Sequence, residues 1–284
     1  MIIDSHCHIF THQIIDNIAR NPPLFEELKL DVVQARQRLE PAALDRSAVA
    51  NNLEICLLLP STGPAKVKAE NDRFMKIAAK SSRLRTLATL HPMMADLADE
   101  VRRVFQLGIY GFKLSSFSQR FSLCSDEIEN MLSSVERIGS DSGIQPVMVL
   151  DTFTRADIHF GAHRDHLTTP VKLRELCLRH PAIRFVGSHM GGLAADFNRL
   201  RRYLTPSANL YLDTSNAAHT LEQAQFIELL KTHGSSKIMF GTDWPWFHHA
   251  AEIPKIRGLL DRAGYSPVDQ AAVFGENARK LFKL

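Results

Sequence analysis

Met1-Ile-Ile-Asp-Ser-His-Cys-His-Ile9 opens the chain, and this stretch decides the fold class. Asp4, His6 and His8 occupy alternate positions, so in a β-strand their side chains share one face. Two imidazoles and a carboxylate on one face are a metal-ligand arrangement, placed where the first strand of a barrel would begin. A lone His-x-His pair is more often structural, so this interpretation depends on metal-type residues at later strand ends.

The composition excludes several classes of function. The chain has 284 residues, 45% of them hydrophobic, which suits one α/β barrel domain over residues 1–284. With 34 Lys and Arg against 31 Asp and Glu, the net charge is +3, and no dense basic block favours nucleic acid or a membrane surface. Four widely spaced cysteines are typical of reduced thiols. Without a signal-peptide pattern or a membrane-spanning run, we expect a cytoplasmic protein.

Eight short apolar runs alternate with helix-like segments. The predicted strands are Ile2–Ile9, Ile55–Leu59, Leu84–Leu90, Ile109–Leu114, Val147–Leu150, Arg184–His189, Asn209–Asp213 and Lys237–Gly241. The predicted helices are Ala42–Asn52, Glu70–Lys80, Leu97–Leu107, Ser125–Ser142, Val171–Arg179, Leu193–Leu204, Leu221–His233 and Val268–Phe282, the last closing the chain. Strict alternation implies parallel strands with right-handed crossovers, and eight units predict a closed (β/α)8 TIM barrel. A doubly wound open sheet is the alternative, weakened because no Gly-rich phosphate fingerprint follows a strand.

Two connections are unusually long, and both follow strands. Residues 10–40 form an insertion after the first strand, with helix-like pieces at His12–Ala19 and Phe25–Leu39. Residues 151–170 follow the fifth strand. Loops after barrel strands lie at the catalytic face, where long ones usually wall or cover a pocket. A surface insertion without a role is the alternative.

Four predicted strand ends carry residues suited to metal chemistry. The first offers His6 and His8, the fourth Lys113, the sixth His189, and the eighth Asp243. Neutral imidazoles and a carboxylate hold a divalent ion, which lowers the pKa of a water towards ~7 and polarises the bond to be attacked. His189 and Asp243 are the expected catalytic groups, because each is able to move a proton.

Five further residues are candidates for substrate binding. Lys113, Arg155 and Arg164 each suit contact with a substrate carboxylate, although an internal ion pair is the plainer interpretation of Lys113. Ser215 follows the seventh strand and is expected to line the pocket. Trp244 suits an apolar or ring-shaped substrate, or else it plugs the barrel rim.

Several motifs together are similar to those of one family. They are Ile3-Asp-Ser-His-Cys-His8, Leu57-Leu-Leu-Pro60, Gly111-Phe-Lys-Leu114, Ser188-His-Met-Gly-Gly192, Tyr211-Leu-Asp-Thr-Ser215, Phe240-Gly-Thr-Asp-Trp-Pro245 and Gly275-Glu-Asn277. Over nearly its whole length the chain resembles the amidohydrolase-related (amidohydrolase 2) family of metal-dependent hydrolases, in the amidohydrolase superfamily. The resemblance implies one catalytic metal ion, usually zinc, with His6 and His8 as ligands. It makes Asp243 a ligand and proton shuttle, and His189 the imidazole that orients water or polarises the substrate.

One position departs from the family pattern. The family usually supplies a third histidine ligand at the end of strand 5, in a Pro-Val-x-x-His pattern, and Leu150 stands there in this chain. Asp151 is the first replacement, provided that the strand ends or bulges there. One of the loop histidines (His159, His163 or His166) is the second. A weakened or vacant metal site is the third.

The sequence therefore predicts a metal-dependent hydrolase that splits a C–N or C–O bond of an amide, lactone or ester. Asp243 would move the proton of the attacking water, and His189 would support the oxyanion. A non-oxidative decarboxylase of an unsaturated or aromatic acid, which is a lyase, is the alternative on the same site. A barrel that has lost catalysis and acts as a binding module is a third, supported only by Leu150.

The nitrogen and oxygen ligand set suits zinc best, and it also accommodates Mn2+ or Fe2+. The expected partner is a small molecule, a carboxylate or a ring compound. The oligomeric state stays open, with a homodimer among the options.

Overall fold

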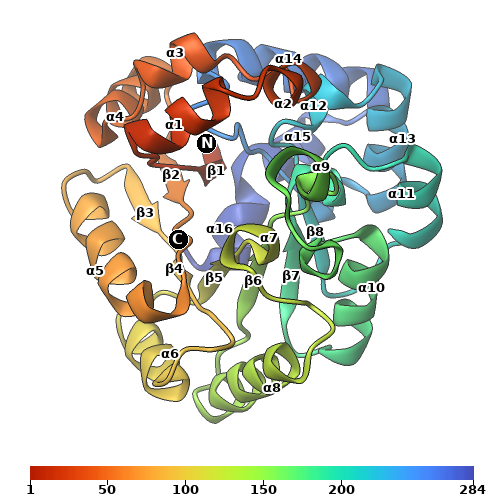
Figure 1. Cartoon of the computed structure of the whole chain (residues 1–284). Coiled ribbons are helices and arrows are strands. Elements are labelled where there is room, and N and C mark those ends of the chain that lie inside the picture. The colour runs from red at the N-terminus through yellow and green to blue at the C-terminus, as the bar shows by residue number, and fades with distance from the viewer.

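The computed structural model describes residues 1–284 and has a ring of parallel strands at its centre (Figure 1). One sheet contains β1 (Ile3–Cys7), β2 (Ile55–Leu58) and β3 (Leu84–Thr86). The other contains β4 (Ala88–Thr89), β5 (Gly111–Leu114), β6 (Val147–Leu150), β7 (Arg184–Gly187), β8 (Leu210–Asp213) and β9 (Ile238–Met239).

Two junctions join these sheets into a barrel. β3 and β4 are halves of one predicted strand, separated only by Leu87. At the other junction, the backbone N–H of Ser5 donates to Phe240 O at 2.9 Å, and that of His8 donates to Trp244 O at 2.8 Å. The structure therefore has the predicted (β/α)8 TIM-barrel architecture.

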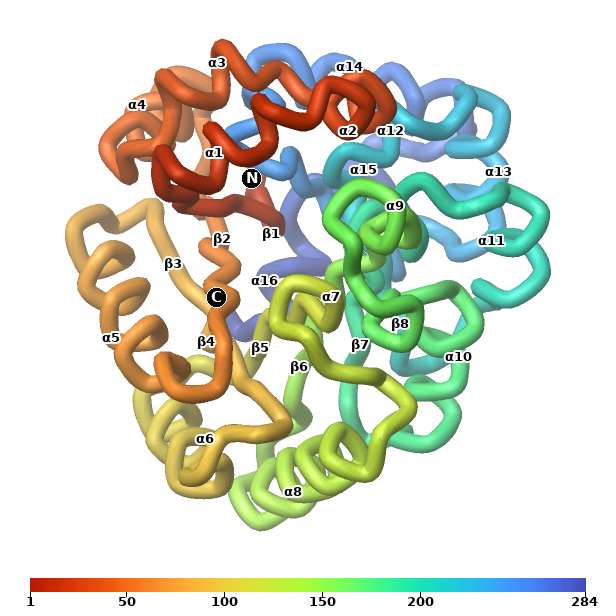
Figure 2. Tube along the Cα trace, in the orientation of Figure 1, coloured from red at the N-terminus to blue at the C-terminus, as the bar shows by residue number.

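The main helices surround the strands, as the Cα trace in Figure 2 also shows. They are α4 (Pro41–Ala50), α5 (Val67–Ala78), α6 (Leu97–Gln106), α8 (Asp126–Asp141), α10 (Pro170–Arg179), α11 (Phe197–Tyr203), α13 (Gln223–His233) and α14 (His249–Ala263). Each packs an apolar stripe against the sheet. In α8, for example, the buried residues Ile128, Met131, Leu132 and Val135 recur at the helical spacing.

The predicted insertion between residues 10 and 40 folds into short helices. They are α1 (His12–Ala19), α2 (Pro22–Glu27) and α3 (Val32–Arg36). The helix-like stretch predicted over Phe25–Leu39 is divided into the end of α2 and α3. Asp31 ends that continuity because its side chain accepts a hydrogen bond from Gln34 N at 2.9 Å and so caps the start of α3.

Shorter elements complete the connections. They are α7 (Ser116–Gln119), α9 (Ala156–Phe160), α12 (Ala217–Thr220) and the 3-10 turns η1 (Pro64–Lys66), η2 (Arg164–His166), η3 (His189–Gly191) and η4 (Ser235–Lys237). The predicted C-terminal helix is divided into α15 (Pro267–Ala271), the π-helical segment η5 (Ala272–Glu276) and α16 (Asn277–Phe282). No helix combines the length and the apolar character that crossing a membrane requires.

The core has two layers. The inner layer fills the barrel with strand side chains such as Ile3, Val149 and Met239, and α16 closes it with Leu281 and Phe282. The outer layer lies between the strands and the helices and is the larger of the two. Because α16 closes the amino-terminal end of the strands, the carboxyl-terminal end is left for the site.

Candidate active site

A bulge in β1 separates Asp4 from the His-x-His pair. Asp4 and Cys7 are three residues apart, whereas their partners on β2, Cys56 and Leu58, are two apart. Ile3 therefore packs in the inner layer and Cys7 in the outer one. The prediction that Asp4 shares a face with both histidines was wrong, because the extra residue reverses the alternation.

His6, His8 and Asp243 converge at the carboxyl-terminal end of the barrel. The Nε2 atoms of His6 and His8 lie 3.0 Å apart, and Asp243 Oδ1 lies 3.7 Å and 3.5 Å from them. The backbone N–H of Asp243 donates to His6 O at 3.0 Å, which holds the loop after β9 against β1. Residues from opposite ends of the sequence thus place three ligand-type atoms within 4.8 Å of one another.

The outer nitrogens of both imidazoles have acceptors as partners. His6 Nδ1 lies 2.9 Å from Asp213 Oδ2, and His8 Nδ1 lies 3.3 Å from Leu59 O. Because a carboxylate and a carbonyl only accept, each Nδ1 carries the proton and each Nε2 presents a lone pair. Two lone pairs facing each other at 3.0 Å repel unless a positive charge lies between them. These three residues therefore fit a divalent ion.

Burial and neighbouring charges keep these ligands in their metal-binding forms. Burial lowers the pKa of His6 to about 4, although the carboxylate of Asp213 opposes this shift. Burial alone would raise the pKa of Asp243, but its contact with His8 and the charges of His189 and His6 lower it to about 2. At neutral pH the site therefore offers imidazole and carboxylate, the forms that bind metal ions.

Asp213 and Ser215 orient His189, the third imidazole of the site. The backbone N–H of His189 donates to Asp213 Oδ1 at 3.0 Å, and its Nδ1 lies 2.8 Å from Ser215 Oγ. The rings of His189 and His6 are 4.9 Å apart, centroid to centroid. Ser215 is fully buried behind these rings. Its contacts are those of a positioning group, and they differ from the predicted contact with substrate.

Lys113 lies below the pocket. Its side chain is buried, and Nζ donates to Ser188 Oγ at 3.2 Å. Burial lowers the pKa of Lys113, while the charges of Asp151, Asp213 and Asp243 raise it. Lys113 does not line the pocket, and these charges favour the internal ion-pair interpretation over contact with a substrate carboxylate.

Asp151 faces the pocket without a bulge. Val149 packs in the inner layer and Leu150 in the outer one, so ordinary alternation turns Asp151 inward. The strand ends at Leu150, which is one of the two conditions under which the sequence allowed Asp151 to face the site. Its Oδ1 accepts a hydrogen bond from Phe153 N at 2.9 Å. No group of three mutually close ligand atoms includes Asp151, so its proposed role as a further ligand depends on movement of its side chain.

The loop after β6 keeps its charged residues away from the pocket. Arg155 Nη1 lies 2.8 Å from Glu27 Oε1, and His159 binds the same carboxylate. Arg164 pairs with Asp157 at 3.2 Å, with 87% of its side chain exposed. Neither arginine and none of the three loop histidines lines the pocket. Acidic partners hold both side chains away from the pocket, so contact of Arg155 or Arg164 with a substrate stays a prediction that requires these ion pairs to break.

Trp244 lies behind β1 rather than in the pocket. It is fully buried, and its ring stacks on His249 with centroids 5.3 Å apart. Phe10 and Trp246 take the place that was predicted for it. The Phe10 ring stacks on His8 with centroids 4.7 Å apart. The sequence indicated aromatic residues here but could not separate neighbours that point in opposite directions.

An apolar pocket of about 130 Å³ opens above the ligand atoms. Its polar lining comprises His8, Asp151, His189, Asn216 and Asp243, and ten of its fifteen lining residues are hydrophobic. Both long connections contribute to it: residues 10–40 supply Phe10, Ile18, Leu24, Leu28 and Leu30, and residues 151–170 supply Asp151, Phe153 and Phe160. Neither connection is therefore a mere surface insertion.

Comparison with known proteins supports this picture. The amidohydrolase family matches residues 3–284. A gamma-resorcylate decarboxylase from Rhodococcus jostii (strain RHA1) is 34% identical over 127 residues, which cover 37% of this chain and 35% of that protein. The aligned segment thus spans about a third of that relative.

Solved structures share the fold over the whole chain. A 2,6-dihydroxybenzoate decarboxylase in complex with 2,6-dihydroxybenzoate has a TM-score of 0.69 at 16% identity, covering 100% of this chain and 98% of that one. A dihydroxybenzoic acid decarboxylase from Polaromonas sp. JS666, with bound manganese and 2-nitroresorcinol, has a TM-score of 0.70 at 20% identity. The match covers 100% of this chain and 97% of that one. An amidohydrolase from Burkholderia multivorans with bound zinc has a TM-score of 0.67 at 16% identity. The match covers 100% of this chain and 99% of that one.

Proposed function

We propose, because this chain belongs to the amidohydrolase family, that it is a metal-dependent decarboxylase of small aromatic carboxylic acids. The sequence by itself favoured hydrolysis, with decarboxylation as the alternative. The 34% identity to a gamma-resorcylate decarboxylase supports that alternative. The observation that carries the proposal is an apolar, ring-lined pocket directly above His8 and Asp243. Such a lining suits an aromatic ring, with its carboxylate turned down towards the ligand atoms.

His6, His8 and Asp243 would hold the ion. A divalent cation bound there would supply positive charge that orients the substrate carboxylate. Zinc and manganese both suit two imidazoles and a carboxylate, so we propose a divalent ion without selecting one. Lys113, buried below, balances the remaining carboxylates of Asp151 and Asp213.

Asp243 is the proposed proton carrier. Its pKa of about 2 means that it enters the reaction as a carboxylate. It takes the proton of a ring hydroxyl group and delivers it to the ring carbon that bears the carboxylate. The bond to the carboxylate then breaks and releases carbon dioxide, and the phenolate product regains a proton from solvent. The electron pair of that bond stays on the ring. His189 Nδ1 lies 2.8 Å from Ser215 Oγ, which positions the imidazole. His189 is placed to stabilise the negative charge that develops on the substrate.

A substrate panel in deuterated water tests this function. Hydroxybenzoates, lactones and cyclic amides are incubated with the metal-supplemented enzyme, and carbon dioxide release is measured together with net hydrolysis. We expect carbon dioxide from hydroxybenzoates only, with one deuterium at the carbon that lost the carboxyl group. Hydrolysis of lactones or amides without carbon dioxide release would contradict the proposal and favour the hydrolase.

Three substitutions complete that test. His6→Ala should abolish turnover and deplete the metal, and Asp243→Asn should abolish turnover, while circular dichroism shows that the barrel stays folded. Full turnover in Asp243→Asn would refute its role. A wild-type protein that takes up no divalent ion after supplementation would instead favour the binding module. Asp151→Ala should weaken metal binding, and an unchanged affinity would exclude Asp151 as a ligand.

A further inference from the structure

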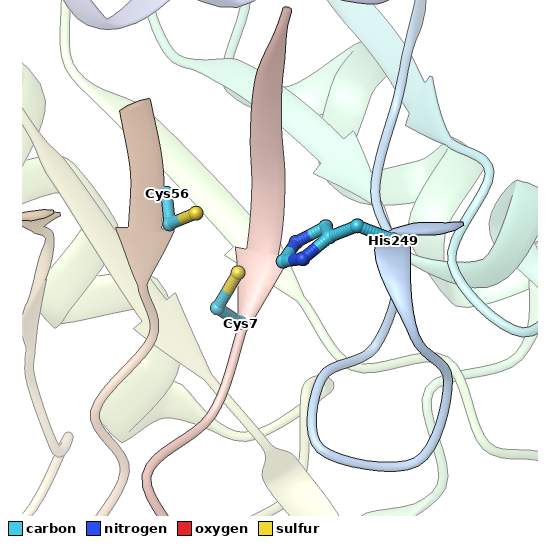
Figure 3. Close-up of side chains that lie close together, drawn as sticks. All are labelled: Cys7, Cys56 and His249. Carbon is cyan, nitrogen blue, oxygen red and sulfur yellow. The ribbon is translucent and has the colours of Figure 1, made fainter. Parts of the chain in front are cut away.

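Cys7, Cys56 and His249 form a second group of metal-type ligands, on the outer face of β1. Figure 3 shows the two thiols and the imidazole gathered beside β1 and β2. Their ligand atoms lie within 4.8 Å of one another, and all three side chains are fully buried. They come from three separate elements, since His249 is the first residue of α14. Nothing in the proposed reaction uses them.

This cluster is separate from the active site although Cys7 lies between His6 and His8 in the sequence. Cys7 packs in the outer layer with Leu58, on the opposite face of the strand from the two imidazoles. The β1 bulge explains the arrangement, because it brings Asp4 and Cys7 to the same outer face, and Asp4 lies in register with Cys56.

The surroundings of His249 resemble those of a metal-binding imidazole. Its Nε2 lies 2.9 Å from Asp4 Oδ2, and Asp4 Oδ1 also accepts from Thr242 N at 3.0 Å. A carboxylate on one ring nitrogen commonly orients the other towards a metal ion. His249 Nδ1 lies 2.8 Å from the hydroxyl of Ser47, and the imidazole also makes a hydrogen bond with the thiol of Cys56. The Ser47 hydroxyl is able to donate to the lone pair of His249 Nδ1. A cation is able to take the place of that donor, and the imidazole nitrogen then still has a partner.

We propose that Cys7, Cys56 and His249 bind a zinc ion that ties β1, β2 and α14 together. Two thiolates and an imidazole are a preferred zinc ligand set, and they discriminate against magnesium and manganese. Binding displaces the two thiol protons into solvent, and the two negative charges then neutralise the dipositive ion. The site is structural, since it fixes the strand that carries the catalytic histidines.

Metal stoichiometry tests the site. The full-length protein is loaded with zinc and freed of loosely bound metal by gel filtration. Elemental mass spectrometry then measures the number of zinc ions per chain. We expect two ions per chain in the wild type and one in Cys56→Ser. Cys177→Ser, a buried cysteine far from β1, is the matched control and should keep both ions. A wild type that holds one ion, or a Cys56→Ser that holds two, overturns the proposal.

Cobalt substitution gives a readout independent of folding of the variants. Cobalt bound by thiolates absorbs in the near ultraviolet, whereas cobalt bound only by nitrogen and oxygen does not. The wild type and a His6→Ala, His8→Ala double variant should both show this band, and Cys7→Ala should lose it. Absence of the band from cobalt-loaded wild type overturns the proposal even if every cysteine variant misfolds. These experiments do not measure activity, so a negative result contradicts the second zinc site and leaves the proposed decarboxylase function untouched.

An unpaired amide in the pocket carries a second inference, which rests on the proposed function. Asn216 lines the pocket with His189 and Asp243, and it is 1% exposed. Neither its Oδ1 nor its Nδ2 has a hydrogen-bond partner. Leaving a buried polar group unpaired costs about 1–3 kcal/mol, so such a group in a pocket points to a ligand.

We infer that Asn216 recognises a hydroxyl group on the substrate ring. An amide offers one acceptor and two donors, which matches a phenolic hydroxyl. No lysine or arginine lines the pocket, so nothing there would pair with a second substrate carboxylate. The geometry therefore points to a ring with one carboxylate, which lies over His8 and Asp243, and at least one neutral hydroxyl.

Calorimetric binding of 2,6-dihydroxybenzoate and benzoate to the metal-loaded protein tests this role. The wild type should bind the hydroxylated acid at least about tenfold more tightly, the effect of a hydrogen bond worth about 1.4 kcal/mol. Asn216→Ala should lose that preference with unchanged metal content, whereas the exposed control Asn198→Ala should keep it. If Asn216→Ala keeps the preference for the hydroxylated acid, the proposed role of Asn216 is wrong, while the decarboxylase proposal still stands. If the wild type binds neither acid, the decarboxylase proposal falls as well.

Discussion

Asp213 divides its two carboxylate oxygens between the imidazole of His6 and the backbone N–H of His189. Oδ2 contacts His6 Nδ1 at 2.9 Å, while Oδ1 accepts from the backbone N–H of His189 at 3.0 Å. Burial raises the pKa of Asp213, but the charge of His6 and their hydrogen bond hold it well below its usual range. A permanently ionised carboxylate therefore selects the nitrogen of His6 that faces the metal position.

Asp213→Asn should weaken metal binding although Asp213 is not itself a ligand. The amide is able to turn its NH2 group towards His6 Nδ1 and favour the wrong tautomer, so we expect affinity to fall roughly 10- to 100-fold. Competition with a chelator of known affinity measures this. Asp165→Asn, an exposed carboxylate in the loop after β6, is the control. An affinity equal to that of the wild type would show that Asp213 has no orienting role.

At the scale of elements, the sequence predicted all eight strand positions, because each is a short apolar run bounded by polar turns. It missed α14, which contains Pro254, a residue that normally ends a helix. It also misplaced Asp4, because the bulge depends on how β1 pairs with a strand about fifty residues away. Arg155 was assigned to the substrate because its partner Glu27 lies far away in the sequence. Side-chain direction and long-range pairing are not encoded in local periodicity.

His233, at the end of α13, makes the fold sensitive to acid. Burial lowers its pKa to about 4, although a hydrogen bond with the backbone of Leu204 raises it, and Nε2 has no partner. The unfolded chain has the ordinary histidine pKa of about 6.5, so it binds more protons than the folded chain between these values. Stability from this group is therefore complete above about pH 6.5 and is lost as the pH falls towards 4.

His233→Leu should flatten the pH dependence of stability. The variant has no imidazole to protonate, so its thermal midpoint should fall less than that of the wild type between pH 7 and about pH 4.5. Thermal unfolding across this range measures the difference in slope, which is independent of any constant loss from repacking. His163→Leu, an exposed histidine, should leave the slope unchanged. Parallel curves for His233→Leu and the wild type would refute the assignment.

In the whole molecule, the metal-type ligands and the helix that closes the barrel lie at opposite ends of the strands. The ligand atoms of His6, His8 and Asp243 occupy the carboxyl-terminal end of the barrel, and α16 fills the other end (Figure 1). Both ends of the sequence meet at this closed end, where Met1 lies against Gly275. Stability and metal binding should therefore respond to different substitutions, as they do in barrels generally.

Phe282→Ala tests this separation. Phe282 is 4% exposed in the inner layer with Ile3 and Leu281, so its loss leaves a cavity at the closed end. Such a cavity costs about 3–5 kcal/mol, which denaturant unfolding measures. Metal affinity under native conditions should stay unchanged, because Phe282 packs at the closed end of the barrel, away from the ligand atoms. Asp213→Asn should show the reverse, with weakened binding and a smaller loss of stability. If Phe282→Ala weakens metal binding while still folded, the two ends of the barrel are coupled and β1 transmits strain along its length.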